Sequence, residues 1–292
     1  MPLYSLHGRP ILPAPDRSSL SPLPHRAVAR ILAITNQKGG VGKTTTAVNL
    51  AASLAVAEQR TLLVDIDPQG NASSALGITR EDIRAGTYEV LLGDAPIADA
   101  MLRSVQFSHL DLLPTTQDLA GAEVELVDDD ARATRLRDAL HTVRDQYDVI
   151  LLDCPPSLGL LTLNALVGAD AVLIPLQCEY FALEGLSQLL ETVDRVRALN
   201  PALAVDGVLL TMYDARLNLS RQVAADARAH FGDRVFTTMI PRNIRLAEAP
   251  SFGKPIVVYD LASVGAQAYM AVAQELIGRL RGTPAPATEP AP

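Results

Sequence analysis

Short apolar runs alternate along the chain with longer segments of helical period. Seven runs read as buried strands: ILAIT (31–35), TLLVDI (61–66), LDLLP (110–114), DVILLD (148–153), AVLIPL (171–176), VDGVLLTM (205–212) and VFTTMI (235–240). Such nearly continuous Val, Ile and Leu runs are typical of parallel strands covered on both faces. Between them apolar residues recur every three or four positions, as in the segments 183–196 and 269–280. The alternation predicts an α/β fold: a doubly wound, mostly parallel sheet flanked by helices.

The two ends of the chain show neither the apolar runs of strands nor the three- to four-residue period of helices. Residues 1–29 are rich in Pro and Ser, and residues 282–292 are rich in Pro and Ala. Segments of this composition do not pack a core, so we expect flexible ends. The segment 30–281 has no internal repeat and is expected to form one domain.

Net charge is negative but unevenly distributed. The chain of 292 residues carries a formal charge of −8, which argues against a protein that coats nucleic acid with its whole surface. The segment 195–250, however, holds eight Arg and five acidic residues, a local charge of +3 that leaves −11 elsewhere. A basic face on an acidic protein is therefore expected there.

Targeting and cysteine usage indicate a cytoplasmic protein. No apolar run reaches the roughly 18 residues that a membrane span needs, and the beginning of the chain does not have the layout of a secretory signal. Cys154 and Cys178 show no CxxC spacing, so we interpret them as small buried apolar residues in a reducing compartment.

The strongest motif is QKGGVGKTTT, which follows the strand 31–35 and precedes an apolar helix expected from Thr44 to Glu58. Strand, glycine-rich turn and helix is the context of a phosphate-binding loop, in which backbone N–H groups and a helix N-terminus face phosphate oxygens. Lys43 would contact the β- and γ-phosphates, and the Thr44 hydroxyl would bind Mg²⁺. The loop residues expected to bind nucleotide are Lys38, Gly39, Gly40, Val41, Gly42, Lys43, Thr44 and Thr45.

One position departs from the general pattern. Where that pattern has glycine, six residues before Lys43, this chain has Gln37, and Lys38 follows it. KGGVGKTT is similar to the deviant loop of the ParA/MinD group of ATPases. The chain resembles the ParA/Soj chromosome-partitioning branch of that group over residues 30 to about 280. The resemblance rests on VDIDPQGNASSALG (64–77), LLDCPPSLG (151–159), QCEYFALEGL (177–186), TMYDARLNLS (211–220) and IPRNIRLAEAPSFGKPI (240–256).

Carboxylates end two of the apolar runs. ATP hydrolysis needs a bound Mg²⁺ and a water aligned with the γ-phosphate. The resemblance implies that Asp67 orients this water, that Asp65 supports the metal and that Asp153 holds Mg²⁺ through a water. It also implies that the turns 68–71 and 155–157 respond to the γ-phosphate, although prolines after a strand are ordinary turn chemistry.

Lys38 poses a separate question, because one lysine suffices for the phosphates of its own loop. The resemblance suggests that Lys38 reaches across a dimer interface to the ATP of the partner subunit. A solvated loop lysine is the alternative. The first interpretation predicts a homodimer that sandwiches two nucleotides.

The loops after the last two apolar runs are expected to frame the adenine and to bind DNA. The resemblance implies Pro241, Asn243 and, less directly, Met212 beside the base. It points to Arg216 and Arg245 as contacts to double-stranded DNA. Binding through phosphates alone would be independent of sequence and sensitive to salt.

The resulting hypothesis is a partitioning ATPase associated with the nucleoid and stimulated by a ParB-like centromere-binding protein. Three alternatives stay open. A MinD-like membrane-positioning ATPase needs a basic amphipathic end, which the neutral tail does not supply. An iron–sulfur protein on this scaffold needs paired cysteines, and Cys154 directly follows Asp153. A ParA-like regulator or positioner of another cargo would use the same residues.

Overall fold

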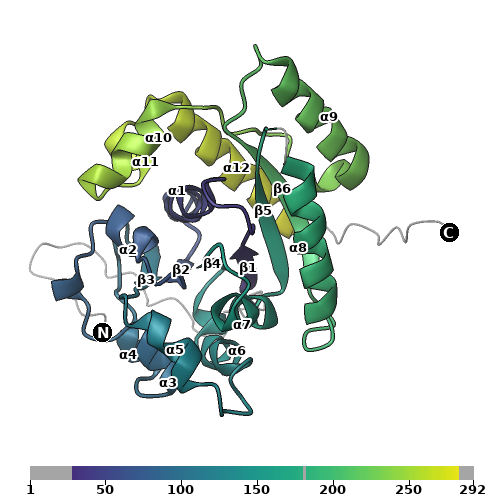
Figure 1. The fold of residues 1–292 in the computed structure, drawn as a ribbon. Coiled ribbons are helices and arrows are strands. Elements are labelled where there is room, and N and C mark those ends of the chain that lie inside the picture. Colours follow the sequence, from purple (N-terminus) through teal and green to yellow (C-terminus); the bar gives the residue numbers. More distant parts are fainter. Residues whose placement is uncertain (1–27, 180–181, 283–292) are drawn as a thin grey trace, which may run out of the picture.

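The computed structural model describes residues 28–179 and 182–282 (Figure 1). The expected end segments therefore lie almost wholly outside the described residues, as do Tyr180 and Phe181 of the motif 177–186. Six parallel strands form one sheet in the order β3-β2-β4-β1-β5-β6. The strands are β1 (Arg30–Ile34), β2 (Thr61–Asp65), β3 (Leu110–Leu113), β4 (Val149–Asp153), β5 (Ala171–Gln177) and β6 (Ala204–Thr211). The predicted fold class, a doubly wound parallel sheet with helices on both faces, is confirmed.

Helices cover both faces of the sheet. Successive apolar side chains along each strand point to opposite faces, so both faces must be buried. Leu32 and Ile34 of β1 join one core and Ile31 and Ala33 the other. The first core is covered by α1 (Lys43–Val56), α2 (Asn71–Ala75), α10 (Ile244–Glu248), α11 (Ile256–Tyr259) and α12 (Val264–Arg281). The second is covered by α3 (Thr87–Leu92), α4 (Ile97–Ala100), α5 (Leu119–Glu125), α6 (Arg135–His141), α7 (Leu160–Gly168), α8 (Ala182–Val196) and α9 (Asn218–Phe231). Short 3₁₀ turns are η2 (Arg80–Asp82), η3 (Arg144–Gln146), η4 (Gly232–Arg234) and η5 (Ala249–Phe252).

The prediction of a seventh strand at 235–240 is wrong. This segment runs beside β6 but forms a single isolated bridge with it, between Val208 and Val235, and the N–H groups of Phe236 and Ile240 donate to β6 carbonyls. The N–H groups of Thr237 and Thr238 donate instead to the Glu275 carboxylate of α12, at 2.8 and 3.0 Å. Backbone donors that bond to a side chain cannot continue a sheet ladder, so the segment does not extend the sheet.

The parallel arrangement brings every carboxyl end to the same edge of the sheet. The loops after β1, β2, β4 and β6 meet there, which is where ligands bind in doubly wound folds. The phosphate loop and the motifs 64–77, 151–159 and 211–220 lie at or just beyond these strand ends. No helix in the described part of the chain is long and apolar enough to cross a membrane.

Candidate functional site

The loop between β1 and α1 forms an open cradle at this edge. Gly40 and Gly42 have φ of 76° and 89°, the left-handed region that glycine adopts without strain. A Cβ built on Gly39 or Gly40 would meet no atom within 4 Å, so the inner side of the turn faces open space. Gly42 caps the N-terminus of α1, which runs for 14 residues. A turn of this kind presents backbone N–H groups and the positive end of a helix to an anion.

Two side chains fix the shape of the loop, one from within it and one from β6. Asn36 donates from Nδ2 to the Pro175 carbonyl at 2.8 Å, and its Oδ1 accepts from the backbone N–H of Lys38 at 3.0 Å. Thr211, the last residue of β6, donates from Oγ1 to the Val41 carbonyl at 2.8 Å. Our sequence reasoning missed Thr211; a hydroxyl at the end of an apolar strand is the only signal that marks it.

The two lysines of the loop have different surroundings. Lys43 is 8% exposed, and its Nζ donates to the Lys38 carbonyl at 3.1 Å. Burial lowers the pKa of Lys43, while the charges of Asp153 and Asp67 act in the opposite direction. Lys38 is more exposed and forms an ion pair with Glu179, which follows β5. Lys43 lines the cleft described below, whereas Lys38 is not among its lining residues.

Asp153 lies at the end of β4 opposite Asp65 at the end of β2, because the two residues are register partners in adjacent strands. Both oxygens of Asp153 are buried and lack a hydrogen-bond partner among the described residues. Burial, followed by the charge of Asp65, raises the pKa of Asp153 well above its ordinary value. An orphaned buried carboxylate is costly unless a cation or ordered water satisfies it.

Asp65 is also fully buried, but its oxygens are occupied. Oδ2 accepts from the backbone N–H and the hydroxyl of Ser73 at 2.8 and 2.7 Å, and Oδ1 accepts from the N–H of Asp67 at 3.3 Å. Burial raises its pKa to about 6 despite these donors. Asp67 is 8% exposed and lines the cleft, where its Oδ1 accepts from the N–H of Gln69 at 3.0 Å. The structure thus brings the three predicted carboxylates together with different partners.

The oxygens of Asp153 and Thr44 fit a metal ion that is bound jointly by the protein and by a phosphate group. In the two described stretches, no group of three or more His, Cys, Asp or Glu side chains could hold a metal alone. Mg²⁺ uses one or two carboxylates together with substrate phosphates and waters rather than an all-protein cage. The free oxygens of Asp153 and the Thr44 hydroxyl supply such a partial set.

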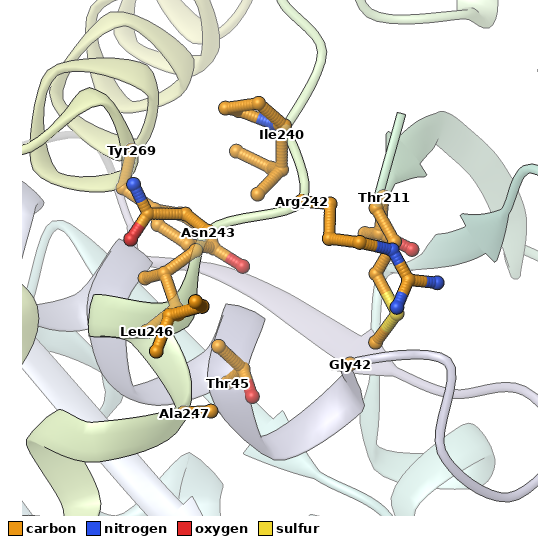
Figure 2. Close-up of a pocket in the computed structure, with 12 residues that line it drawn as sticks. Gly42, Thr45, Thr211, Ile240, Arg242, Asn243, Leu246, Ala247 and Tyr269 are labelled. Carbon is orange, nitrogen blue, oxygen red and sulfur yellow. The ribbon is translucent and has the colours of Figure 1, made fainter. Parts of the chain in front are cut away.

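Two hollows that share lining residues extend from the loop. A cleft of about 630 Å³ is lined by the loop glycines, Lys43, Asp67 and the turn 155–157. A second pocket of about 300 Å³ shares Gly42, Thr45 and Met212 with it. Figure 2 shows that residues from α1, from the end of β6, from α10 and from α12 surround this pocket.

The second pocket is mainly apolar and holds the residues expected beside the base. Pro241 and Asn243 line it, together with Leu246 and Tyr269, to which our sequence reasoning gave no role in binding. Asn243 Oδ1 caps α10 by accepting from the N–H of Arg245 at 2.8 Å, which leaves the Nδ2 group to donate to a ligand. Met212 has φ of 50°, a left-handed conformation that is uncommon for a long side chain and is found at ligand sites.

The two predicted DNA-binding arginines lie outside these hollows and are ion-paired within the chain. Arg216 is 89% exposed and bonds through two nitrogens to Asp214 at 2.9 and 2.7 Å. That hydrogen bonding lowers the pKa of Asp214 to about 2. Arg245 pairs with Glu248 at 2.9 Å and lies 3.5 Å from Asp260. The local excess of arginine is therefore partly neutralised by neighbouring carboxylates.

Comparisons with known proteins agree with this geometry. The model of a family described as "AAA domain" matches residues 29–205. The chain is 59% identical over 253 residues to "Chromosome partitioning protein ParA" of Myxococcus xanthus, covering 86% of this chain and 89% of that protein. It is 56% identical over 250 residues to "Sporulation initiation inhibitor protein Soj" of Bacillus subtilis, covering 85% and 98%. Among solved structures, it is similar to cobyrinic acid a,c-diamide synthase of Mycobacterium smegmatis with bound ADP and magnesium, with TM-score 0.74, 40% identity, and 85% and 94% coverage.

Proposed function

The chain belongs to the ParA/Soj family of chromosome-partitioning proteins, and on that premise we propose that it is a magnesium-dependent ATPase that segregates DNA. The observation that carries the proposal is the pairing of an open glycine cradle with a buried lysine and a buried carboxylate whose oxygens are free. Nucleotide phosphates and a divalent cation complement that arrangement in charge and in hydrogen bonding.

ATP extends across both hollows in this proposal. The loop amides and Lys43 bind the phosphates, Thr45 bonds the α-phosphate, and the adenine lies in the apolar pocket beside Pro241 and Asn243. Thr44 and Asp153 would hold Mg²⁺, Asp153 through a water, and Asp65 would support the metal site from the adjacent strand. When bound, Mg²⁺ neutralises charge on the β- and γ-phosphates.

Asp67 aligns the water that attacks the γ-phosphate. It borders the phosphate cleft from the turn after β2, close to Lys43, whose pKa responds to its charge. Lys38 completes the site from the neighbouring subunit, so that hydrolysis requires a nucleotide-sandwich homodimer. The partial exposure of its side chain supports this role, because an exposed cation can reach a partner subunit that a buried one cannot.

The ATP-bound dimer binds double-stranded DNA through Arg216 and Arg245 without preference for sequence. Both side chains are exposed, and two subunits provide the multivalency that so few cations need. A ParB-like centromere-binding protein triggers hydrolysis and release from DNA. Because the ATP-bound dimer binds DNA without preference for sequence, the protein associates with the nucleoid in the cytoplasm.

The test is ATP binding and ATP-dependent DNA binding by the purified protein, measured for the wild type, for Lys43→Ala and for Lys254→Ala as an exposed-lysine control. We expect Lys43→Ala to lose both activities, because it removes the buried cation of the cleft, and Lys254→Ala to keep both. A wild type that binds no ATP, or a Lys43→Ala variant that binds it normally, would contradict the proposal.

A further inference from the structure

The magnesium site of the proposed function contains two buried carboxylates that are not equivalent. Asp65 and Asp153 lie opposite each other at the ends of adjacent strands, and both are fully buried. Asp65 accepts hydrogen bonds on both oxygens, whereas the oxygens of Asp153 accept none from the described residues. Ser73 supplies two of the three hydrogen bonds on Asp65, one from its backbone N–H and one from its hydroxyl, and so creates most of this difference.

Ser73 meets Asp65 with two donors at once. Its backbone N–H lies 2.8 Å and its hydroxyl 2.7 Å from Asp65 Oδ2. Hydrogen bonds to an ionised carboxylate are shorter and stronger than those between neutral groups. A carboxylate oxygen that is bonded twice in this way has a fixed orientation, and it does not turn toward the cleft.

Ser73 is itself held in place by nearby segments of the same chain. It is 2% exposed, and its Oγ accepts from the N–H of Thr115, just beyond β3, at 3.3 Å. The carbonyl of Asp65 is held in addition by the Thr87 hydroxyl at 2.7 Å. The Ser73 hydroxyl therefore joins three elements: the end of β2, the helix α2 and the segment after β3.

We propose that Ser73 is a positioning residue for the metal site: it fixes the orientation of Asp65 as a supporting carboxylate, so that Asp153 presents the free oxygens to Mg²⁺. This inference rests on the proposed function. Two adjacent carboxylates without such a restraint compete for the same waters and donors. Partners that orient groups around a metal ligand matter about as much as the ligand, and their loss costs about 10- to 100-fold in metal affinity.

The same contact links the metal site to the turn that carries Asp67. Helix α2 begins at Asn71, immediately after that turn, and its N-cap Gly70 donates to the Asp67 carbonyl at 2.8 Å. Ser73 lies within this helix, so the hydroxyl that orients Asp65 also ties the Asp67 turn to the sheet. Removal of the hydroxyl is thus expected to lower the turnover number as well as the affinity for magnesium.

The test compares Ser73→Ala with Ser73→Thr, which keeps a hydroxyl, and with Ser74→Ala, an exposed serine of the same helix. Binding of a fluorescent ATP analogue is titrated with MgCl₂, and it is also measured in EDTA. We expect Ser73→Ala to need roughly tenfold more Mg²⁺ for half-saturation, with its binding in EDTA unchanged. Ser73→Thr should restore the wild-type value, and Ser74→Ala should keep it.

The controls separate this inference from the proposed function. If the wild type binds no nucleotide with or without Mg²⁺, the proposed function fails. If the wild type binds and Ser73→Ala shows the wild-type dependence on Mg²⁺, the role of Ser73 alone is refuted. A Ser73→Ala variant that loses binding equally in EDTA also refutes it, because the defect is then general. Should the alanine variant not fold, Ser73→Cys keeps the volume with a weak donor and must show the same shift.

Discussion

Release of Lys38 from its own subunit is a step that the proposed dimer requires, and it can be measured. In the single chain Lys38 forms an ion pair with Glu179, and the two side chains are each 36% exposed. A lysine that contacts the ATP of a partner must first leave this carboxylate. Replacement of Glu179 by Gln removes the charge and keeps the shape, so the variant should dimerise more tightly in ATP.

The size of the effect follows from the exposure of the pair. Ion pairs with this access to solvent contribute up to about 1 kcal/mol, because water screens the attraction and both side chains lose freedom. A symmetric dimer breaks two such pairs, which gives up to about 2 kcal/mol. Since each 1.4 kcal/mol corresponds to a factor of ten, the dimer Kd should fall by as much as about thirtyfold.

Sedimentation equilibrium in a non-hydrolysable ATP analogue measures this Kd directly. The gain for Glu179→Gln should shrink in about 0.5 M salt, where charges are strongly screened. Asp194→Asn, which breaks the exposed Arg197–Asp194 pair at the end of α8, is the matched control and should leave the Kd unchanged. The gain should also vanish when Lys38→Ala is added. An unchanged or weaker dimer for Glu179→Gln would refute the reasoning, because Glu179 would then not restrain Lys38.

Three other changes test separate parts of the molecule. Asp67→Ala should bind ATP normally but hydrolyse it at least about a hundredfold more slowly, so that gel filtration with ATP shows a trapped dimer; a monomer would remove Asp67 from its role. Arg245→Ala should weaken DNA binding equally for all sequences and reduce the salt slope by about one per subunit, whereas unchanged gel shifts would exclude this residue. Gly207→Ala should lower stability by about 1–3 kcal/mol, because its Cβ would lie 2.4 Å from the Phe236 ring. Gly278→Ala, in open space on α12, should instead raise stability by up to about 1 kcal/mol, and thermal melting compares the two.

The sequence by itself determined the fold class and the chemistry of the main loop. Six of the seven apolar runs are strands, because a strand buried on both faces has to be apolar at every position. The phosphate loop was equally predictable, since its glycines, lysine and helix start are local in the chain. The carboxylates Asp65 and Asp153 were found for a similar reason: each ends an apolar strand, and parallel strands end at one edge.

Tertiary contacts decided the rest, because they join residues that no local pattern relates. The segment 235–240 has the composition of a strand, yet a carboxylate of α12 takes two of its backbone donors. Lys38 and Glu179 are far apart in the sequence, and so are Thr211 and the loop carbonyl that it braces. Ser73 was unremarkable in the sequence, where it follows the aspartates as one small polar residue among several. Only the packing of α2 against the sheet makes it a donor to Asp65, beside the unpartnered oxygens of Asp153.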